Sequence, residues 1–71
     1  MARNVEAQIT GSVWKIEKGV GEAVEEGEAI LILESMKMEI PVEAPVPGRL
    51  AEIRVREGEN VEEGAVLAVI E

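Results

Sequence analysis

An internal repeat constrains the fold of this chain more than any other feature. Residues 1–34 align with residues 38–71 without a gap, at the constant offset that carries Gly11 onto Gly48. Within the alignment, Val24-Glu25-Glu26-Gly27 falls on Val61-Glu62-Glu63-Gly64, four identities in a row. A repeat of this quality predicts two copies of one structural unit. We therefore expect a single domain, residues 1–71, whose halves 1–34 and 38–71 are related by a pseudo-two-fold axis.

The repeat leaves over only Ser35-Met36-Lys37, which joins the two halves. A tight hairpin usually needs Gly, Asn or Asp to reach positive φ, yet none of the seven glycines lies in this bridge. Segments that break local rules are often functional. The sequence therefore predicts a functional hairpin at residues 35–37 that holds the Lys37 side chain in solvent.

Each half reads as a series of short strands separated by glycine-containing turns. In the first half, residues 3–9, 13–18 and 29–34 favour strands, with Thr10-Gly11-Ser12 as a turn. Residues 22–27, with Val24 as their one large apolar residue, favour a short strand or a turn. Val13 and Ile16 are apolar in both copies but three residues apart, so period-two alternation cannot place them on one face. We therefore expect either a β-bulge between these two positions or a strand that crosses from one sheet to the other.

Two copies of a four-strand unit predict about eight strands and an all-β fold. Closing them into a small sandwich or flattened barrel hides strand edges that a lone sheet would expose. Residues 29–34 are almost wholly apolar and favour a central strand, whereas Pro41 favours an edge strand or a bulge. The two-fold relation would place the bridge at one end of the molecule and both termini at the other.

Composition excludes several function classes. The 71 residues include no His and no Cys, which removes the usual general base, thiolate chemistry and the commonest metal ligands. A net charge of −8 argues against a nucleic-acid partner. The longest apolar runs, residues 29–33 and 65–70, are too short to cross a membrane, and no signal peptide is evident at the N-terminus. We therefore expect a cytoplasmic protein with no membrane partner.

The central segment Glu34-Ser35-Met36-Lys37-Met38 resembles the Met-Lys-Met acceptor of biotinyl domains, the biotin carboxyl carriers of carboxylases. The resemblance covers the whole chain: Ala44-Pro45-x-x-Gly48 and the two Gly-Glu-x-Val-x-x-Gly segments are similar to other signatures of that family. The short length and Val13-Trp14-Lys15 are most similar to the small stand-alone biotin/lipoyl attachment proteins. The fold implied is a flattened eight-strand barrel of two four-stranded sheets, of the single hybrid motif type.

The resemblance also implies a function. Lys37 corresponds to the lysine that a biotin protein ligase joins to biotin through an amide, and Met36 and Met38 correspond to the flanking methionines that the ligase recognises. The chain would be a carrier and not an enzyme, with no catalytic or metal-binding residues. Its attached biotin would shuttle carboxyl groups between a biotin carboxylase and a carboxyltransferase.

The chain departs from the biotinyl pattern in two respects. Ser35 stands where most carriers have Ala, and no insertion precedes Gly21 that could form the protruding thumb of some bacterial carriers. Glu34-Ser35 is also similar to lipoyl domains, which continue with Asp-Lys-Ala. Lipoate is therefore the second candidate cofactor, in service of a 2-oxoacid dehydrogenase or a glycine cleavage system. An adaptor barrel with unmodified Lys37 is a third hypothesis.

Several other residues are interpreted structurally. Trp14, the only aromatic residue, is expected to be a half-buried core residue. Glu34 and Glu39 are expected to be solvated. The pairs Glu25-Glu26 and Glu62-Glu63 recur beside turn glycines, so we interpret them as solvated turns and not as paired catalytic carboxylates.

Overall fold

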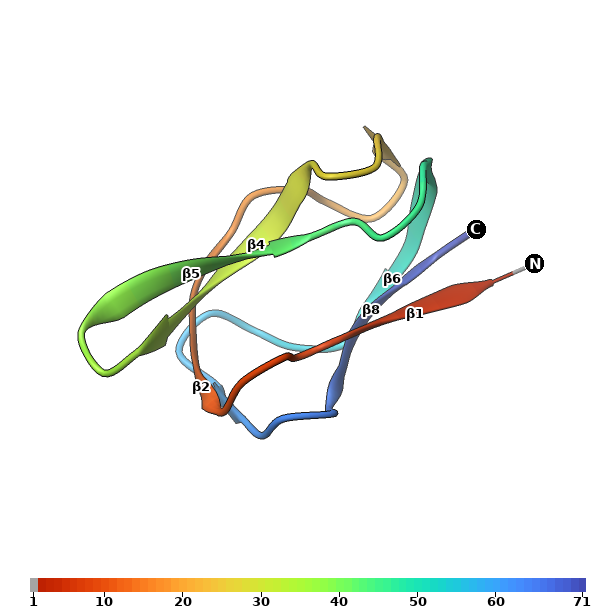
Figure 1. Cartoon of the computed structure of the whole chain (residues 1–71). Helices are drawn as coiled ribbons and strands as arrows, with labels where there is room; N and C mark the ends of the chain where they lie inside the picture. Colours follow the sequence, from red (N-terminus) through yellow and green to blue (C-terminus); the bar gives the residue numbers. More distant parts are fainter. Residues whose placement is uncertain (1) are drawn as a thin grey trace.

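A computed structural model describes residues 2–71, and the structure is all-β (Figure 1). No helix occurs anywhere in that span. The eight strands are β1 (Arg3–Glu6), β2 (Gly11–Ile16), β3 (Ala23–Val24), β4 (Ala29–Ser35), β5 (Met38–Glu43), β6 (Gly48–Ile53), β7 (Asn60–Val61) and β8 (Val66–Ile70).

The strands form two four-stranded antiparallel sheets, in the orders β1-β8-β6-β3 and β5-β4-β2-β7. Exchanging the repeat halves converts the first order into the second, strand by strand. The hydrogen bonds follow the same rule: Ala7 N–H donates to the Ala65 carbonyl at 2.9 Å, and its equivalent Ala44 N–H donates to the Glu28 carbonyl at 2.9 Å. The predicted all-β fold with an internal pseudo-two-fold is confirmed.

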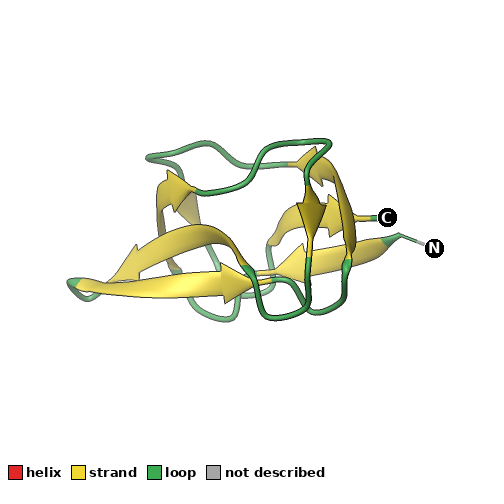
Figure 2. Cartoon of the chain, turned by 90° about the horizontal axis from the view of Figure 1, so that it is seen from above, coloured by secondary structure: helices red, strands yellow, loops and turns green. Residues whose placement is uncertain are grey.

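The molecule is elongated, with principal extents of 33 × 17 × 17 Å. The β4–β5 hairpin extends beyond the body at one end, and the start of β1 and the end of β8 lie at the opposite end (Figures 1 and 2). The two-fold relation between the halves accounts for this separation. The segment that joins the halves lies at one pole, so the outer ends of the two halves lie at the other.

The core is apolar and repeats between the halves. Ile30 and its equivalent Leu67 are completely buried, as are Leu31 and its equivalent Ala68. No polar or charged side chain is buried within residues 2–71. Burial of aliphatic side chains from both sheets is therefore the main source of stability in this small domain.

β-bulges occur at equivalent places in both halves, between Val13 and Lys15 and between Leu50 and Glu52. They confirm the bulge predicted from the three-residue apolar spacing. The extra residue in the first half is Trp14, which is 47% exposed and lies outside the buried core. The predicted half-exposure of Trp14 agrees with this value, but its assignment to the core is wrong, because the residue that follows the buried Val13 faces away from the core.

Three further strand predictions can be compared with the structure. β4 is a central strand and β5, which carries Pro41, is an edge strand, as expected. Gly11 and Ser12 begin β2 instead of forming a turn. Gly11 is needed there because a Cβ at this position would lie 2.6 Å from the Glu34 carbonyl oxygen, closer than real Cβ contacts.

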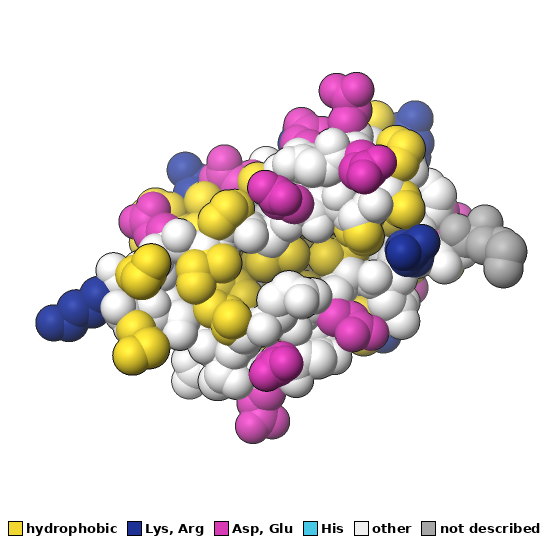
Figure 3. Space-filling model, viewed as in Figure 1, with side chains coloured by type: hydrophobic (Ala, Val, Ile, Leu, Met, Phe, Trp, Pro, Cys, Tyr) yellow, Lys and Arg dark blue, Asp and Glu magenta, His cyan; other side chains and the backbone are white. Residues whose placement is uncertain are grey.

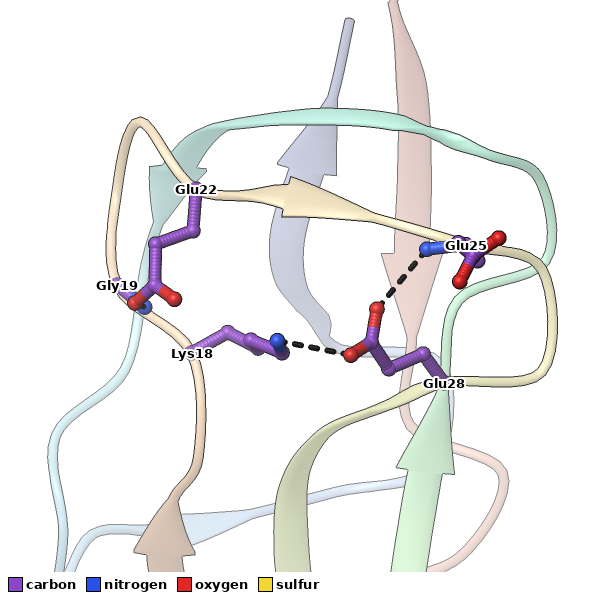
Figure 4. Close-up of polar contacts among 5 residues, drawn as sticks. All are labelled: Lys18, Gly19, Glu22, Glu25 and Glu28. Carbon is purple, nitrogen blue, oxygen red and sulfur yellow. Dashed lines mark hydrogen bonds and ion pairs between the residues drawn. The ribbon is translucent and has the colours of Figure 1, made fainter.

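An ion pair in the first half has no counterpart in the second half. Lys18 and Glu28 form an ion pair at 2.8 Å between Nζ and Oε2, and Glu28 Oε1 also accepts the Glu25 N–H at 3.0 Å (Figure 4). The equivalent positions in the second half are Val55, which is buried, and Ala65. The hydrogen bond to Lys18, helped by the Glu25 N–H, lowers the pKa of Glu28, and the hydrogen bond to Glu28 raises the pKa of Lys18.

This contact predicts an acid-dependent contribution to stability. Because its pKa is lower in the folded state, the Glu28 carboxylate stabilises the fold above its ordinary pKa of 4.5 and loses that effect as the pH falls through the folded value. Glu28→Gln should therefore be less stable than the parent at pH 7, and the difference should disappear near pH 3. Urea unfolding at both pH values measures it, with Glu26→Gln as an exposed control. An equal deficit at both pH values would contradict the prediction.

Candidate functional site

A two-residue turn joins β4 to β5. Ser35 pairs with Met38 across the hairpin, so the loop consists of Met36 and Lys37 alone. Both have positive φ, 54° and 66°. Positive φ at both loop positions is the pattern of a type I′ turn, whose twist matches that of the paired strands.

The conformation of this turn is costly for its residues. Side chains with a Cβ pay about 1–2 kcal/mol for the left-handed region, which is why type I′ turns favour Asn-Gly. Among residues 2–71, Met36 and Lys37 are the only non-glycine residues with positive φ. Strain of this kind is typical of functional positions.

The side chains of the turn are open to solvent. Met36 is 91% exposed, Met38 is 64% exposed, and Lys37 is exposed between them. Figure 3 shows a basic side chain projecting from the end of the molecule where the hairpin turns, with hydrophobic side chains beside it. Lys37 is the only Lys or Arg in the two strands and their turn.

The body of the domain holds the turn in place. Ile30, Leu31 and Leu33 of β4 are buried in the core, and β4 pairs with both β5 and β2. The absence of a side chain at Gly11 lets β2 pack closely against the backbone of Glu34, one residue before the last residue of β4. The lysine is therefore carried by a rigid hairpin anchored close to its turn.

Two carboxylates lie below the turn. Glu34 and Glu39 are paired across the hairpin, one position before the Ser35–Met38 pair, and both are exposed, as predicted. Like charges directly opposite each other are unfavourable in a sheet. This pair is therefore a second local feature that sheet stability alone does not explain.

The chemistry of the site is that of one accessible primary amine. Lys37 makes no ion pair within residues 2–71, so its Nζ is available to form an amide bond.

No cluster of acidic residues in that span has the arrangement of a metal site. Glu25-Glu26 and Glu62-Glu63 are exposed beside their turns. No helix in the described part of the chain is long and apolar enough to cross a membrane.

The cost of the turn can be tested by giving it the preferred sequence. Met36→Asn with Lys37→Gly creates the Asn-Gly pair of type I′ turns, so the double variant should be about 1 kcal/mol more stable than the parent. Lys37→Arg, which keeps a Cβ at the same φ, should leave stability unchanged. Thermal or urea unfolding of the three proteins measures these differences. A double variant that is less stable than the parent would show that the turn is not strained.

Known proteins resemble both the sequence and the fold. A family model described as "Biotin-requiring enzyme", the biotin/lipoyl family, matches residues 4–70. The chain is 47% identical over 38 residues to the Biotin/lipoyl attachment protein of Bacillus subtilis, covering 54% of this chain and 52% of that protein. It is 48% identical over 42 residues to the Biotinylated protein TB7.3 homolog of Mycolicibacterium smegmatis, covering 59% of each chain. The aligned part thus spans about half to three fifths of these relatives.

Solved structures extend the likeness to the whole fold. The urea carboxylase of Kluyveromyces lactis superposes with a TM-score of 0.95 and 37% identity, over 100% of this chain and 6% of that one. A single-chain, multi-domain long-chain acyl-CoA carboxylase superposes with a TM-score of 0.89 and 29% identity, over 96% of this chain and 7% of that one. Together with the family match across nearly its full length, these likenesses show that the chain belongs to the biotin/lipoyl family of biotin-requiring proteins, as a biotinyl domain.

Proposed function

We propose that this protein is a biotin carboxyl carrier domain in which the Lys37 side chain bears biotin through an amide bond. In this proposal, residues 1–71 act as one carrier domain, with halves 1–34 and 38–71 on either side of the acceptor hairpin 35–37. The observation that carries the proposal is the exposed lysine on a strained, non-glycine turn of the β4–β5 hairpin, which projects from one end of the molecule. Membership of a biotin-requiring family supports the choice of cofactor.

The attachment step fits the accessibility of Lys37. A biotin protein ligase would take one proton from the Lys37 ammonium and present an activated acyl group. The neutral Nζ would then attack the carbonyl carbon, form the amide bond and lose a second proton as the leaving group departs. An exposed amine at the end of a hairpin can enter the active site of another enzyme without movement of the fold. Met36 and Met38 are flexible and polarizable, which suits side chains that contact several partners in turn.

The domain itself would contribute delivery and not catalysis. Attached biotin supplies a ring that a biotin carboxylase loads and a carboxyltransferase unloads, as the carboxylase neighbours suggest. The rigid hairpin raises the effective concentration of the tethered group at each active site. The net charge of −8 keeps the domain soluble and limits unspecific binding to other proteins between encounters with its partner enzymes.

Lipoate is the alternative cofactor for the same lysine. Glu34-Ser35 before the turn is similar to lipoyl domains, and one relative is named Biotin/lipoyl attachment protein. Met36 and Met38 favour biotin, because lipoyl domains have Asp and Ala at these places. The intact mass of the protein after growth with each ligase separates the two, since biotinyl and lipoyl amides differ in mass.

Replacing the acceptor gives the primary test. Lys37→Arg should abolish biotinylation while the fold survives, because the side chain is exposed and the charge is kept. Lys15→Arg and Lys18→Arg are matched controls that should still be labelled. Intact mass measures labelling, and modification should also move the net charge from −8 to −9, since one positive charge is lost. A folded Lys37→Arg protein that still carries biotin would refute the assignment.

The identity of the cofactor gives a second test. Met36→Asp with Met38→Ala creates a lipoyl-like turn, and neither methionine belongs to the core. Stability should therefore change by less than about 0.5 kcal/mol. Biotin labelling should fall sharply, with lipoyl transfer unchanged or improved, in competitive labelling by the two ligases read by mass. Undiminished biotin labelling would show that the ligase reads only the placement of the lysine.

A further inference from the structure

The side chains that oxidants attack most readily are concentrated at the acceptor turn. The chain has no Cys, one Trp and three Met. Two of the methionines, Met36 and Met38, flank Lys37, and the third, Met1, lies outside the described residues. Without a thiol, the thioethers are the first groups in this chain to react with a mild peroxide.

Exposure makes both thioethers accessible. The Met36 side chain is 91% exposed and that of Met38 is 64% exposed, whereas most methionines in folded proteins are buried. A sulfur lone pair attacks one oxygen of the peroxide, the O–O bond breaks, an S–O bond forms and water leaves. Methionine is thereby oxidised to its sulfoxide and the peroxide is reduced to water.

The fold should tolerate this change. Neither side chain belongs to the buried core, and Met36 lies in the turn between the two strands. Met38 is held by strand pairing with Ser35, which uses the backbone and not the thioether. Oxidation would therefore alter the chemistry of the acceptor surface while the hairpin keeps its conformation.

We propose that Met36 and Met38 are an oxidant-sensitive modification site, whose conversion to sulfoxides by a peroxide reversibly suppresses attachment of the cofactor at Lys37. A sulfoxide replaces an apolar side chain with a polar one on each side of the acceptor. An enzyme surface that buries the thioethers would have to bury these oxygens without matched partners. The effect on attachment rests on the proposed function, whereas the oxidation itself depends only on the exposure of the two residues.

The experiment uses the full-length unmodified protein treated with hydrogen peroxide. Peptide mapping should find both turn methionines oxidised, Met36 faster than Met38, and distinguishes them from Met1. Circular dichroism and the unfolding midpoint should be unchanged. Labelling by a biotin ligase, compared before and after treatment, should slow by at least about tenfold, as expected for burial of an unpaired polar group. A methionine sulfoxide reductase should restore the original rate.

The variant Met36→Leu with Met38→Leu is the matched control. Whatever its own starting rate, peroxide should not change that rate, because the oxidisable sulfurs at the turn are gone. An oxidised parent labelled as fast as the untreated one would overturn the proposal, and so would an equal loss in the Leu variant or a failure of the reductase to restore labelling. If the untreated parent accepts neither biotin nor lipoate, the proposed function fails as well, which the untreated sample reveals separately.

Discussion

The structure depends on the interleaving of two repeat halves around one apolar core. Each sheet takes two strands from each half, so neither four-stranded sheet is built by one half alone. The equivalent side chains Ile30 and Leu67 are both completely buried, which shows that the halves contribute alike to the core. In a domain of this size, which buries only about 60% of its unfolded surface, a core shared in this way leaves little stability in reserve.

The turn between β4 and β5 lowers that stability. Met36 and Lys37 adopt positive φ without being glycine, and Glu34 faces Glu39 across the hairpin. The hairpin forms despite these two unfavourable features because β4 lies centrally in its sheet, with three buried side chains. The stable core and the strained turn are therefore linked through a single strand.

The sequence predicted those features that the repeat or strong chemistry determines. The eight-strand fold, the bulges, the central position of β4 and the edge position of Pro41 follow from apolar spacing and from proline's missing N–H. Trp14 was wrongly assigned to the core because hydrophobicity alone does not show which residue of a bulge faces away from the core. The small residue at the equivalent position, Ala51, was the signal that this position does not need a large core side chain. Gly11 resembled a turn glycine, although it is required by a close approach of β2 to β4, which becomes visible only in three dimensions.

The strain at the turn and the definite position of the lysine have the same physical origin. A glycine-rich loop would adopt positive φ without cost, but it would also allow many other conformations. Residues with a Cβ have far fewer alternatives, so once the paired strands force the left-handed conformation the turn stays in it. The positive φ of Met36 and Lys37 therefore lowers the stability of the fold, and it also gives the turn a low conformational freedom. Under the proposed function, in which a group on Lys37 is presented to successive partners, the flexibility would lie in the side chain and its attachment and not in the backbone.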